Sequence, residues 1–166
     1  MICPVCGFEN LQGEDNCENC GADLRTADLP IPGSRFERAL LNHSLGSLAP
    51  PAARSVTPEL SAAEAVDGMR AAGERALVVA LGGRVVGIFT ERDALRKLAG
   101  SNIDGVTVGE VMTADPVVLR TDDSVAVAIH KMAVGGFRHI PIVEDGRPTG
   151  VVTARDIFHH LAQTMD

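Results

Sequence analysis

Aromatic side chains are scarce in this sequence, which has no tryptophan, no tyrosine and five phenylalanines among 166 residues. A site that stacks nucleic-acid bases between aromatic rings is therefore not expected. Basic residues are also in the minority, because 15 Lys and Arg stand against 22 Asp and Glu and give a formal net charge of −7. This negative charge argues against a nucleic-acid partner, whose phosphates a binding protein must neutralise.

Three further absences narrow the class of protein. No apolar run approaches the roughly 20 residues that a bilayer crossing needs, so we expect no membrane partner. The first residues, Met1-Ile2-Cys3-Pro4, include no basic segment followed by an apolar one, so we expect no secretory signal and a cytoplasmic protein. No Walker lysine and no Ser-His-acid set in a recognisable nucleophile context occur, so we expect no catalytic residues and no enzyme.

All four cysteines lie within the first twenty residues, as two Cys-x-x-Cys pairs, Cys3/Cys6 and Cys17/Cys20, each followed by a glycine. Disulfides are rare in a reducing compartment, whereas two residues between thiolates let a tight turn aim both sulfurs at one ion. Four thiolates satisfy tetrahedral Zn²⁺ and leave no open position, so the spacing predicts a structural zinc site. Tetrathiolate iron, as in a small electron carrier, is the alternative.

Residues 1–24 resemble the short zinc-ribbon family, in which a Cys-Pro-x-Cys-Gly turn is followed by a Cys-x-x-Cys-Gly turn. Residues 1–28 carry six acidic side chains and one basic one, so a polyanion would be repelled. The ribbon is then either a docking site for an unknown protein partner or a small folded cap on the next domain.

Residues 25–33 contain two prolines and a glycine, which is typical of a boundary. The following Ser34-Arg35-Phe36-Glu37 fits a capping box that opens a short helix. We therefore divide the chain into a zinc ribbon (1–24), a linker with a short helix (25–45) and two repeats (46–100 and 101–166).

The two repeats are copies of one unit at an offset of 63 residues. The string Gly87–Asp93 aligns with Gly150–Asp156, and Arg75 aligns with Arg138. Each copy predicts the order strand–helix–strand–strand–helix. In the second copy we expect an extended start at 116–119, a helix at 124–134, strands at 139–143 and 149–152 around an Asp145-Gly146 turn, and a last helix from Thr153. Neither copy can bury a good core alone, so we expect both to pack into one α/β (α+β) globule.

Residues 46–164 resemble a tandem pair of cystathionine-β-synthase (CBS) domains, also called a Bateman module. The resemblance is carried by the two Gly-apolar-apolar-Thr-x-x-Asp strings, the strand Phe137–Val143 and the leader string Gly109–Thr113, of which Gly46–Leu48 is a weaker counterpart. It implies two βαββα repeats packed as a pseudo-two-fold pair. The first copy has Ala76 where the second has a basic residue, so we expect two unequal clefts.

The Thr-x-x-Asp strings, Thr90/Asp93 and Thr153/Asp156, have the spacing of a capping box, which needs no ligand. A helix start also favours an anion, and a carboxylate beside it can accept hydrogen bonds from both hydroxyls of a ribose. The same strings therefore fit both a structural and a binding role.

In the CBS family this Asp holds a ribose and the Thr lies near the phosphate. The resemblance thus implies ribose contacts for Asp93 and Asp156, and phosphate or ribose contacts for Thr90 and Thr153. It also implies phosphate contacts for Arg138 and His139. Further phosphate candidates are Arg92 and Arg155, which a solvated helix face explains equally well, and aliphatic walls for an adenine are Val117, Ile140 and Pro141.

We therefore expect a regulatory module that binds an adenine nucleotide (AMP, ADP, ATP or an S-adenosyl compound), reorients its repeats on binding, and pairs through its helical faces into a homodimer. The alternative is a ligand-free structural adaptor, in which the ribbon docks a partner and the CBS pair only dimerises.

Overall fold

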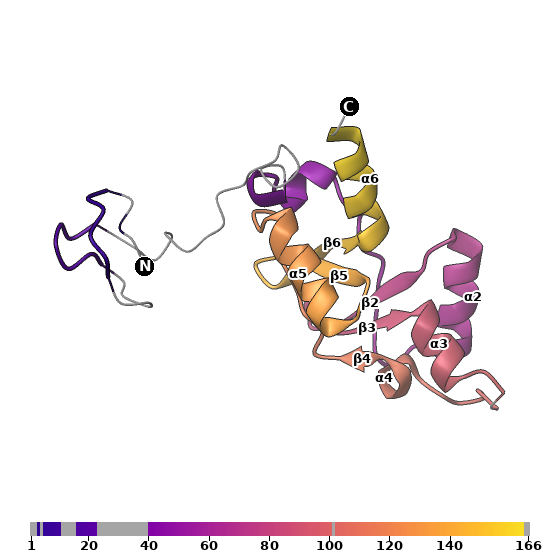
Figure 1. Ribbon diagram of the computed structural model, residues 1–166. Coiled ribbons are helices and arrows are strands. Elements are labelled where there is room, and N and C mark those ends of the chain that lie inside the picture. Colours follow the sequence, from indigo (N-terminus) through magenta and orange to yellow (C-terminus); the bar gives the residue numbers. More distant parts are fainter. Residues whose placement is uncertain (1–2, 4, 11–15, 23–39, 101, 165–166) are drawn as a thin grey trace. The chain divides into compact units, whose positions relative to one another are not determined.

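The computed structural model describes residues 3, 5–10, 16–22, 40–100 and 102–164, and the chain divides into two compact units, residues 1–34 and 35–166 (Figure 1). The helix start expected at Ser34–Glu37 lies outside the described residues, although residues 40–42 are helical. Throughout the described ranges, no helix combines the length and the apolarity that a membrane span requires.

The first repeat has the expected order of elements: β1 (Ser55–Val56), α2 (Ala62–Ala72), β2 (Ala76–Leu81), β3 (Arg84–Thr90) and α3 (Glu91–Lys97). Strand β1 pairs with β2 in parallel, and β2 pairs with β3 in an antiparallel hairpin. The short strand β4 (Thr113–Ala114) adds to the other edge of β3, which completes a four-stranded sheet in the order β1-β2-β3-β4.

The second repeat has the same elements 63 residues later: α5 (Val125–Gly135), β5 (His139–Glu144), β6 (Arg147–Thr153) and α6 (Ala154–Thr164). Leu119 bridges Ile142 in parallel, at the position where β1 meets β2 in the first repeat. Asp145 (φ +50°) and Gly146 (φ +78°) form the turn of the β5–β6 hairpin, as the sequence predicts. These elements confirm the α+β fold with two βαββα repeats.

The two leader segments, which we define as residues 43–53 and 106–116, exchange places between the repeats. The second leader, which contains α4 (Val108–Val111), binds the first repeat through Val108 N–H to Leu60 C=O (2.8 Å) and Gly109 N–H to Pro58 C=O (2.8 Å). The first leader, which contains the 3₁₀ helix η1 (Leu45–Leu48), makes the equivalent bonds in the second repeat, from Leu45 to Asp123 and from Gly46 to Thr121 (both 2.8 Å). The same hydrogen bonds therefore occur twice, related by the repeat.

Each hydrophobic core is completed by the leader of the other repeat. Leu45 is fully buried in the core of the second repeat beside Val125 and Ile140, whereas Val108 and Val111 belong to the core of the first. Glycine permits the close approach, because a Cβ at Gly87 would collide with the Met112 side chain and a Cβ at Gly150 would lie 3.1 Å from the Pro51 carbonyl oxygen. The two repeats are thus joined in one unit, because each core includes residues of the other repeat's leader.

Candidate functional site

The four cysteines of the N-terminal unit converge on one point. Their Sγ atoms all lie within 4.8 Å of one another, with Cys3 and Cys20 3.7 Å apart and Cys6 and Cys17 3.6 Å apart. A tetrahedron of thiolates at the Zn–S distance of about 2.3 Å has S···S edges of roughly 3.8 Å. The arrangement of the sulfurs therefore fits one tetrahedral metal ion.

Two similar turns present these sulfurs. Gly7 N–H donates to the Cys3 carbonyl (2.9 Å) and Gly21 N–H donates to the Cys17 carbonyl (2.8 Å), with both glycines at positive φ. Burial raises the pKa of Cys17, but backbone hydrogen bonds from Cys20 and Asn19 outweigh it and lower that pKa to about 6. A thiolate is the form that binds a metal, and the surroundings of Cys17 favour that form. For Cys20, a backbone hydrogen bond from Ala22 lowers the pKa, but contacts with the other sulfurs, together with burial, outweigh it and raise that pKa to about 12.

In the larger unit, a cleft of about 1400 Å³ lies between the two repeats. Both Thr-x-x-Asp strings line it, together with the ends of β2 and β5 and the first turns of α3 and α6. Eight of the predicted ligand-binding residues share this lining: Thr90, Arg92, Asp93, Arg138, His139, Thr153, Arg155 and Asp156.

The cleft is positive although the chain is negative. Seven Lys and Arg line it against four Asp and Glu, which gives a formal charge of +3, whereas the whole chain carries −7. Such a concentration of one sign in a concave site attracts ligands of the opposite sign. The cleft is therefore suited to an anion.

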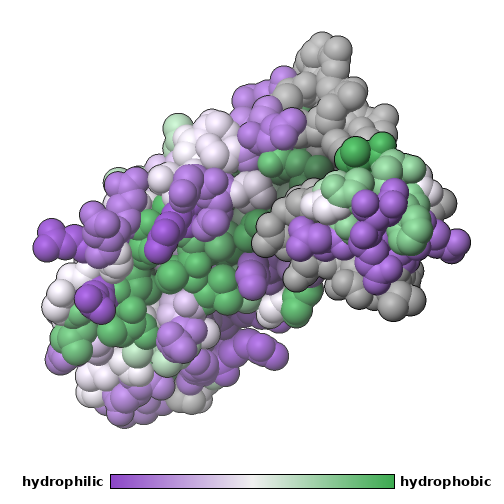
Figure 2. All heavy atoms as spheres, turned by 90° about the vertical axis from the view of Figure 1, so that its left-hand side faces the viewer, coloured by the Kyte–Doolittle hydropathy of each residue, from purple (hydrophilic) through white to green (hydrophobic). Residues whose placement is uncertain are grey.

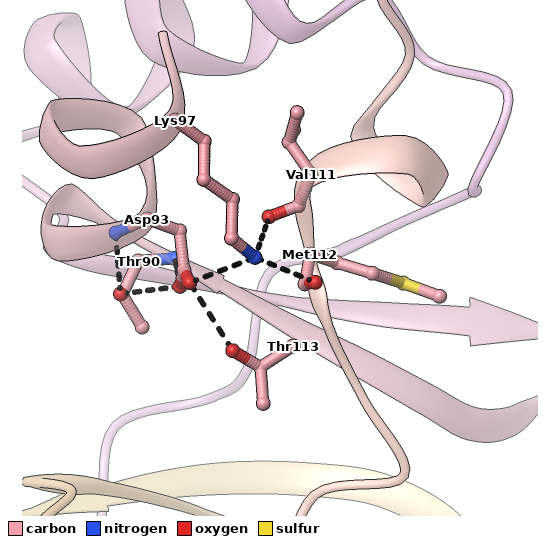
Figure 3. Close-up of polar contacts among 6 residues, drawn as sticks. All are labelled: Thr90, Asp93, Lys97, Val111, Met112 and Thr113. Carbon is pink, nitrogen blue, oxygen red and sulfur yellow. Dashed lines mark hydrogen bonds and ion pairs between the residues drawn. The ribbon is translucent and has the colours of Figure 1, made fainter. Parts of the chain in front are cut away.

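Both Thr-x-x-Asp strings form the expected capping boxes. Figure 3 shows the one formed by Thr90 and Asp93. Thr90 donates its backbone N–H (3.0 Å) and its hydroxyl (2.6 Å) to Asp93 Oδ2, and Asp93 N–H donates back to Thr90 Oγ1 (3.3 Å). Thr153 and Asp156 repeat this pattern at 2.9, 2.7 and 3.1 Å. Each capping box uses one carboxylate oxygen and leaves the other available for further contacts.

The basic residues of the cleft differ between the repeats. His139 pairs across the strands with Thr153, and the equivalent partner of Thr90 is Ala76. Burial lowers the pKa of His139 from its ordinary value of 6.5, and the charges of Arg75 and Arg138 act in the same direction against Glu91 and Asp156. Arg92 donates to the Gly136 carbonyl of the other repeat (3.2 Å), which is a bond across the cleft.

Three residues expected as an adenine wall are not part of this lining. Ile140 and Pro141 are fully buried in the fold, and Val117 is 38% exposed elsewhere. The apolar lining comes instead from Ala52, Ala53, Ala76, Phe137, Val151 and Ala154, with Leu95 in α3 and Phe158 in α6. Ile140 belongs to the hydrophobic core of the second repeat, where it packs beside Leu45 and Val125.

Sequence reasoning missed Arg54, Arg75, Arg96 and Lys97, which also line the cleft. For Arg75 a signal existed, since it aligns with Arg138 at the repeat offset. For Arg54 none existed, because its position depends on where the first leader docks.

Solved CBS-domain structures share the fold of the larger unit. The CBS-domain protein ATU1752 from Agrobacterium tumefaciens is 29% identical and superposes with a TM-score of 0.64 over 70% of this chain and 98% of that one. CBSX2 in complex with AMP gives 0.65 at 21% identity, over 74% of this chain and 98% of that one. The CBS domain pair of MJ0100 in complex with 5′-methylthioadenosine and S-adenosyl-L-methionine gives 0.63 at 23%, over 70% and 98%.

Among curated sequences, an uncharacterised 17.7 kDa protein of Acidianus ambivalens is 38% identical over 108 residues, which is 64% of this chain and 65% of that one. Inosine-5′-monophosphate dehydrogenase of Korarchaeum cryptofilum is 36% identical over 106 residues, which is 63% of this chain and 21% of the enzyme. The chain thus spans less than two thirds of either relative. The family model for the CBS domain matches twice, at residues 48–100 and 108–163, and the chain therefore belongs to the CBS-domain family.

Proposed function

We propose that this CBS pair is a regulatory module that binds an adenine nucleotide or S-adenosyl compound in the cleft between its repeats. The observation that carries the proposal is the positive cleft that both Thr-x-x-Asp strings line within an acidic chain. It is supported by the AMP complex of CBSX2 and by the adenosyl complexes of MJ0100, which share the fold. No catalytic residue is assigned.

In this proposal the carboxylates of Asp93 and Asp156 are the two candidate ribose acceptors, and Thr90 and Thr153 orient them through the capping boxes. Arg138, His139, Arg92 and Arg155 supply positive charge for phosphates, and Arg75 joins them. The adenine lies against apolar lining residues such as Ala76, Phe137 and Val151. A ligand that contacts both repeats regulates only if it binds their two relative orientations unequally.

Calorimetric titration with AMP, ADP, ATP and S-adenosylmethionine tests this function. We expect micromolar binding of at least one of them, about −8 kcal/mol, and a large loss for the 2′-deoxy form of the nucleotide that binds. The double variant Asp93→Asn/Asp156→Asn should abolish binding. The matched control is Asp67→Asn/Asp104→Asn, which removes two exposed carboxylates outside the cleft lining. Unchanged binding by the Asp93/Asp156 variant would refute the ribose assignment.

The capping boxes favour one alternative, a structural adaptor that binds no ligand. They provide hydrogen-bond partners within the chain for Thr90, Asp93, Thr153 and Asp156. A ligand-free adaptor accounts for them equally. Wild-type protein that shows neither heat of binding nor a shift in melting temperature with all four compounds would establish the adaptor and refute the sensor.

For the N-terminal unit we propose a structural Zn²⁺ held by Cys3, Cys6, Cys17 and Cys20, in a ribbon that docks a protein partner. The near-tetrahedral spacing of the sulfurs supports the metal. Metal analysis should give one zinc per chain in a colourless preparation, whereas a coloured protein containing iron would favour the electron carrier.

We also propose a homodimer formed through the helices of the CBS pair. Helix α5 exposes Val127 (38%) and Val134 (76%), seven residues apart on one helical face. Figure 2 looks onto the side where α5 lies in Figure 1 and shows hydrophobic side chains gathered in a broad patch. Val134→Glu should halve the mass measured by light scattering, while Leu81→Glu, at the exposed tip of the β2–β3 hairpin, should leave it unchanged.

A further inference from the structure

Asp93 and Asp156 differ in the contacts of Oδ1, the carboxylate oxygen that the capping box does not use. Asp93 Oδ1 accepts a hydrogen bond from Thr113 Oγ1 (3.1 Å) and an ion pair from Lys97 Nζ (3.4 Å), as Figure 3 shows. For Asp156, hydrogen bonds reach only Oδ2, and no bond or ion pair to Oδ1 occurs among the residues that the structure describes. The Asp93 carboxylate is thus engaged on both oxygens, and the Asp156 carboxylate on one.

Divergence of the two repeats explains the difference. At the offset of 63 residues, Lys97 corresponds to His160 and Thr113 to Pro50. His160 is directed elsewhere, since its Nε2 lies 2.8 Å from His43 Nδ1, and a proline has no hydroxyl to donate. The second repeat therefore lacks both donors that engage the first carboxylate.

Lys97 is held in place by more than the carboxylate. Its ammonium also donates to the carbonyl oxygens of Val111 (2.7 Å) and Met112 (3.0 Å), at the C-terminal end of α4. Two carbonyl oxygens of the second leader and the Asp93 carboxylate thus hold the ammonium, and the carbonyl end of a helix favours a cation. A ribose at Asp93 must therefore compete with an ordered donor, and with Thr113, for the same oxygen.

The part of the cleft next to Asp156 offers an additional contact to a ligand, the His139 side chain. The imidazole of His139 stands opposite Thr153, where the Asp93 end has the methyl group of Ala76 opposite Thr90. A ring N–H can donate to a phosphate or an adenine nitrogen, whereas a methyl group cannot.

We propose, on the basis of the function proposed above, that each chain binds one adenine nucleotide with its ribose on Asp156. Lys97 and Thr113 occupy the Asp93 carboxylate and so prevent a second nucleotide from binding there. Lys97 is in this sense a specificity-determining residue that sets the stoichiometry. A ribose at Asp93 binds at least about tenfold more weakly than one at Asp156, which corresponds to 1.4 kcal/mol.

Calorimetry with AMP and with S-adenosylmethionine on the full, zinc-loaded chain tests the assignment. We expect one site per chain, at least tenfold weaker binding by Asp156→Asn, and a second site in Lys97→Met/Thr113→Val that is lost again when Asp93→Asn is added. Lys131→Met, which removes an exposed lysine outside the cleft lining, is the matched control and keeps one site. His139→Gln leaves both capping boxes intact and should also weaken binding, which guards against misfolding of Asp156→Asn.

Three results would overturn the assignment while the proposed function stands: two equal sites in the wild type, undiminished binding by Asp156→Asn and His139→Gln, or a single site in Lys97→Met/Thr113→Val. Failure of the function itself is visible earlier, because the wild type would then bind neither probe.

Discussion

Replacement of Leu45 by alanine should destabilise the second repeat, although Leu45 precedes the first repeat in sequence. Its side chain is fully buried among Val125, Ile140 and Ile157. A Leu→Ala change at such a site costs about 3 kcal/mol, from the lost transfer free energy and the cavity that remains. With an unfolding entropy of about 2.1 cal/mol/K per residue, a unit of roughly 130 residues should lose about 10 °C in Tm.

Urea unfolding measures the free energy, and amide hydrogen exchange shows where protection is lost. Leu45→Ala should accelerate exchange first in α5, β5 and α6, whereas Val108→Ala should do so in α2, β2 and α3, because the leaders are exchanged. Leu41→Ala, at a half-exposed leucine, is the control and should change little. Loss of protection in the first repeat on Leu45→Ala would refute the exchanged packing.

Further expectations concern the cap, the histidine and the metal. Thr153→Ala removes the hydroxyl that caps α6 and should cost about 1 kcal/mol in urea unfolding. It should also weaken nucleotide binding in calorimetry, because the same hydroxyl orients the Asp156 carboxylate. Burial lowers the pKa of His139, so the folded state favours the neutral imidazole. The contribution of this histidine to the free energy of unfolding is therefore complete above about pH 6.5 and is lost as the pH falls below that value. His139→Gln should accordingly make Tm less dependent on pH between about pH 5 and 7. A strong zinc chelator should abolish amide protection in the described residues of the N-terminal unit, because a structural metal stabilises the fold that binds it, and should leave the thermal transition of the larger unit in place. A shift of that transition on chelation would contradict this expectation.

Much of the fold was predictable because the duplication doubles every local signal. The helix expected at 124–134 is α5 at Val125–Gly135, and the Asp145-Gly146 turn joins β5 to β6. Both capping boxes form as their spacing indicates. These features depend on interactions within a few residues of chain, which a single sequence displays directly.

The exchange of leaders was not predictable from the same patterns. Gly46-Ser47-Leu48 and Gly109–Thr113 mark two similar segments, but an apolar residue such as Leu45 fits either core equally well by composition. A leader could make the same contacts in its own repeat as in the other repeat. Only the geometry of the connecting segments determines which of the two repeats it packs against. The docking of the two leaders also places Arg54 in the cleft and Thr113 against Asp93. Neither position can be predicted from local sequence patterns.

The exchange also gives the proposed ligand a physical route between the repeats. A nucleotide on Asp156 lies in a cleft that includes Ala52 and Ala53 of the first leader and the next residue, Arg54, which leads directly into β1 of the first repeat. Arg54 in turn donates to the Gly68 carbonyl (3.3 Å) and pairs with Glu74 (3.3 Å), at and just beyond α2. A ligand that moves the first leader therefore acts on the hydrogen bonds of both repeats at once. Coupling of this kind needs no long pathway, since one short segment is part of the binding site, of the second repeat's sheet and of the connection to the first.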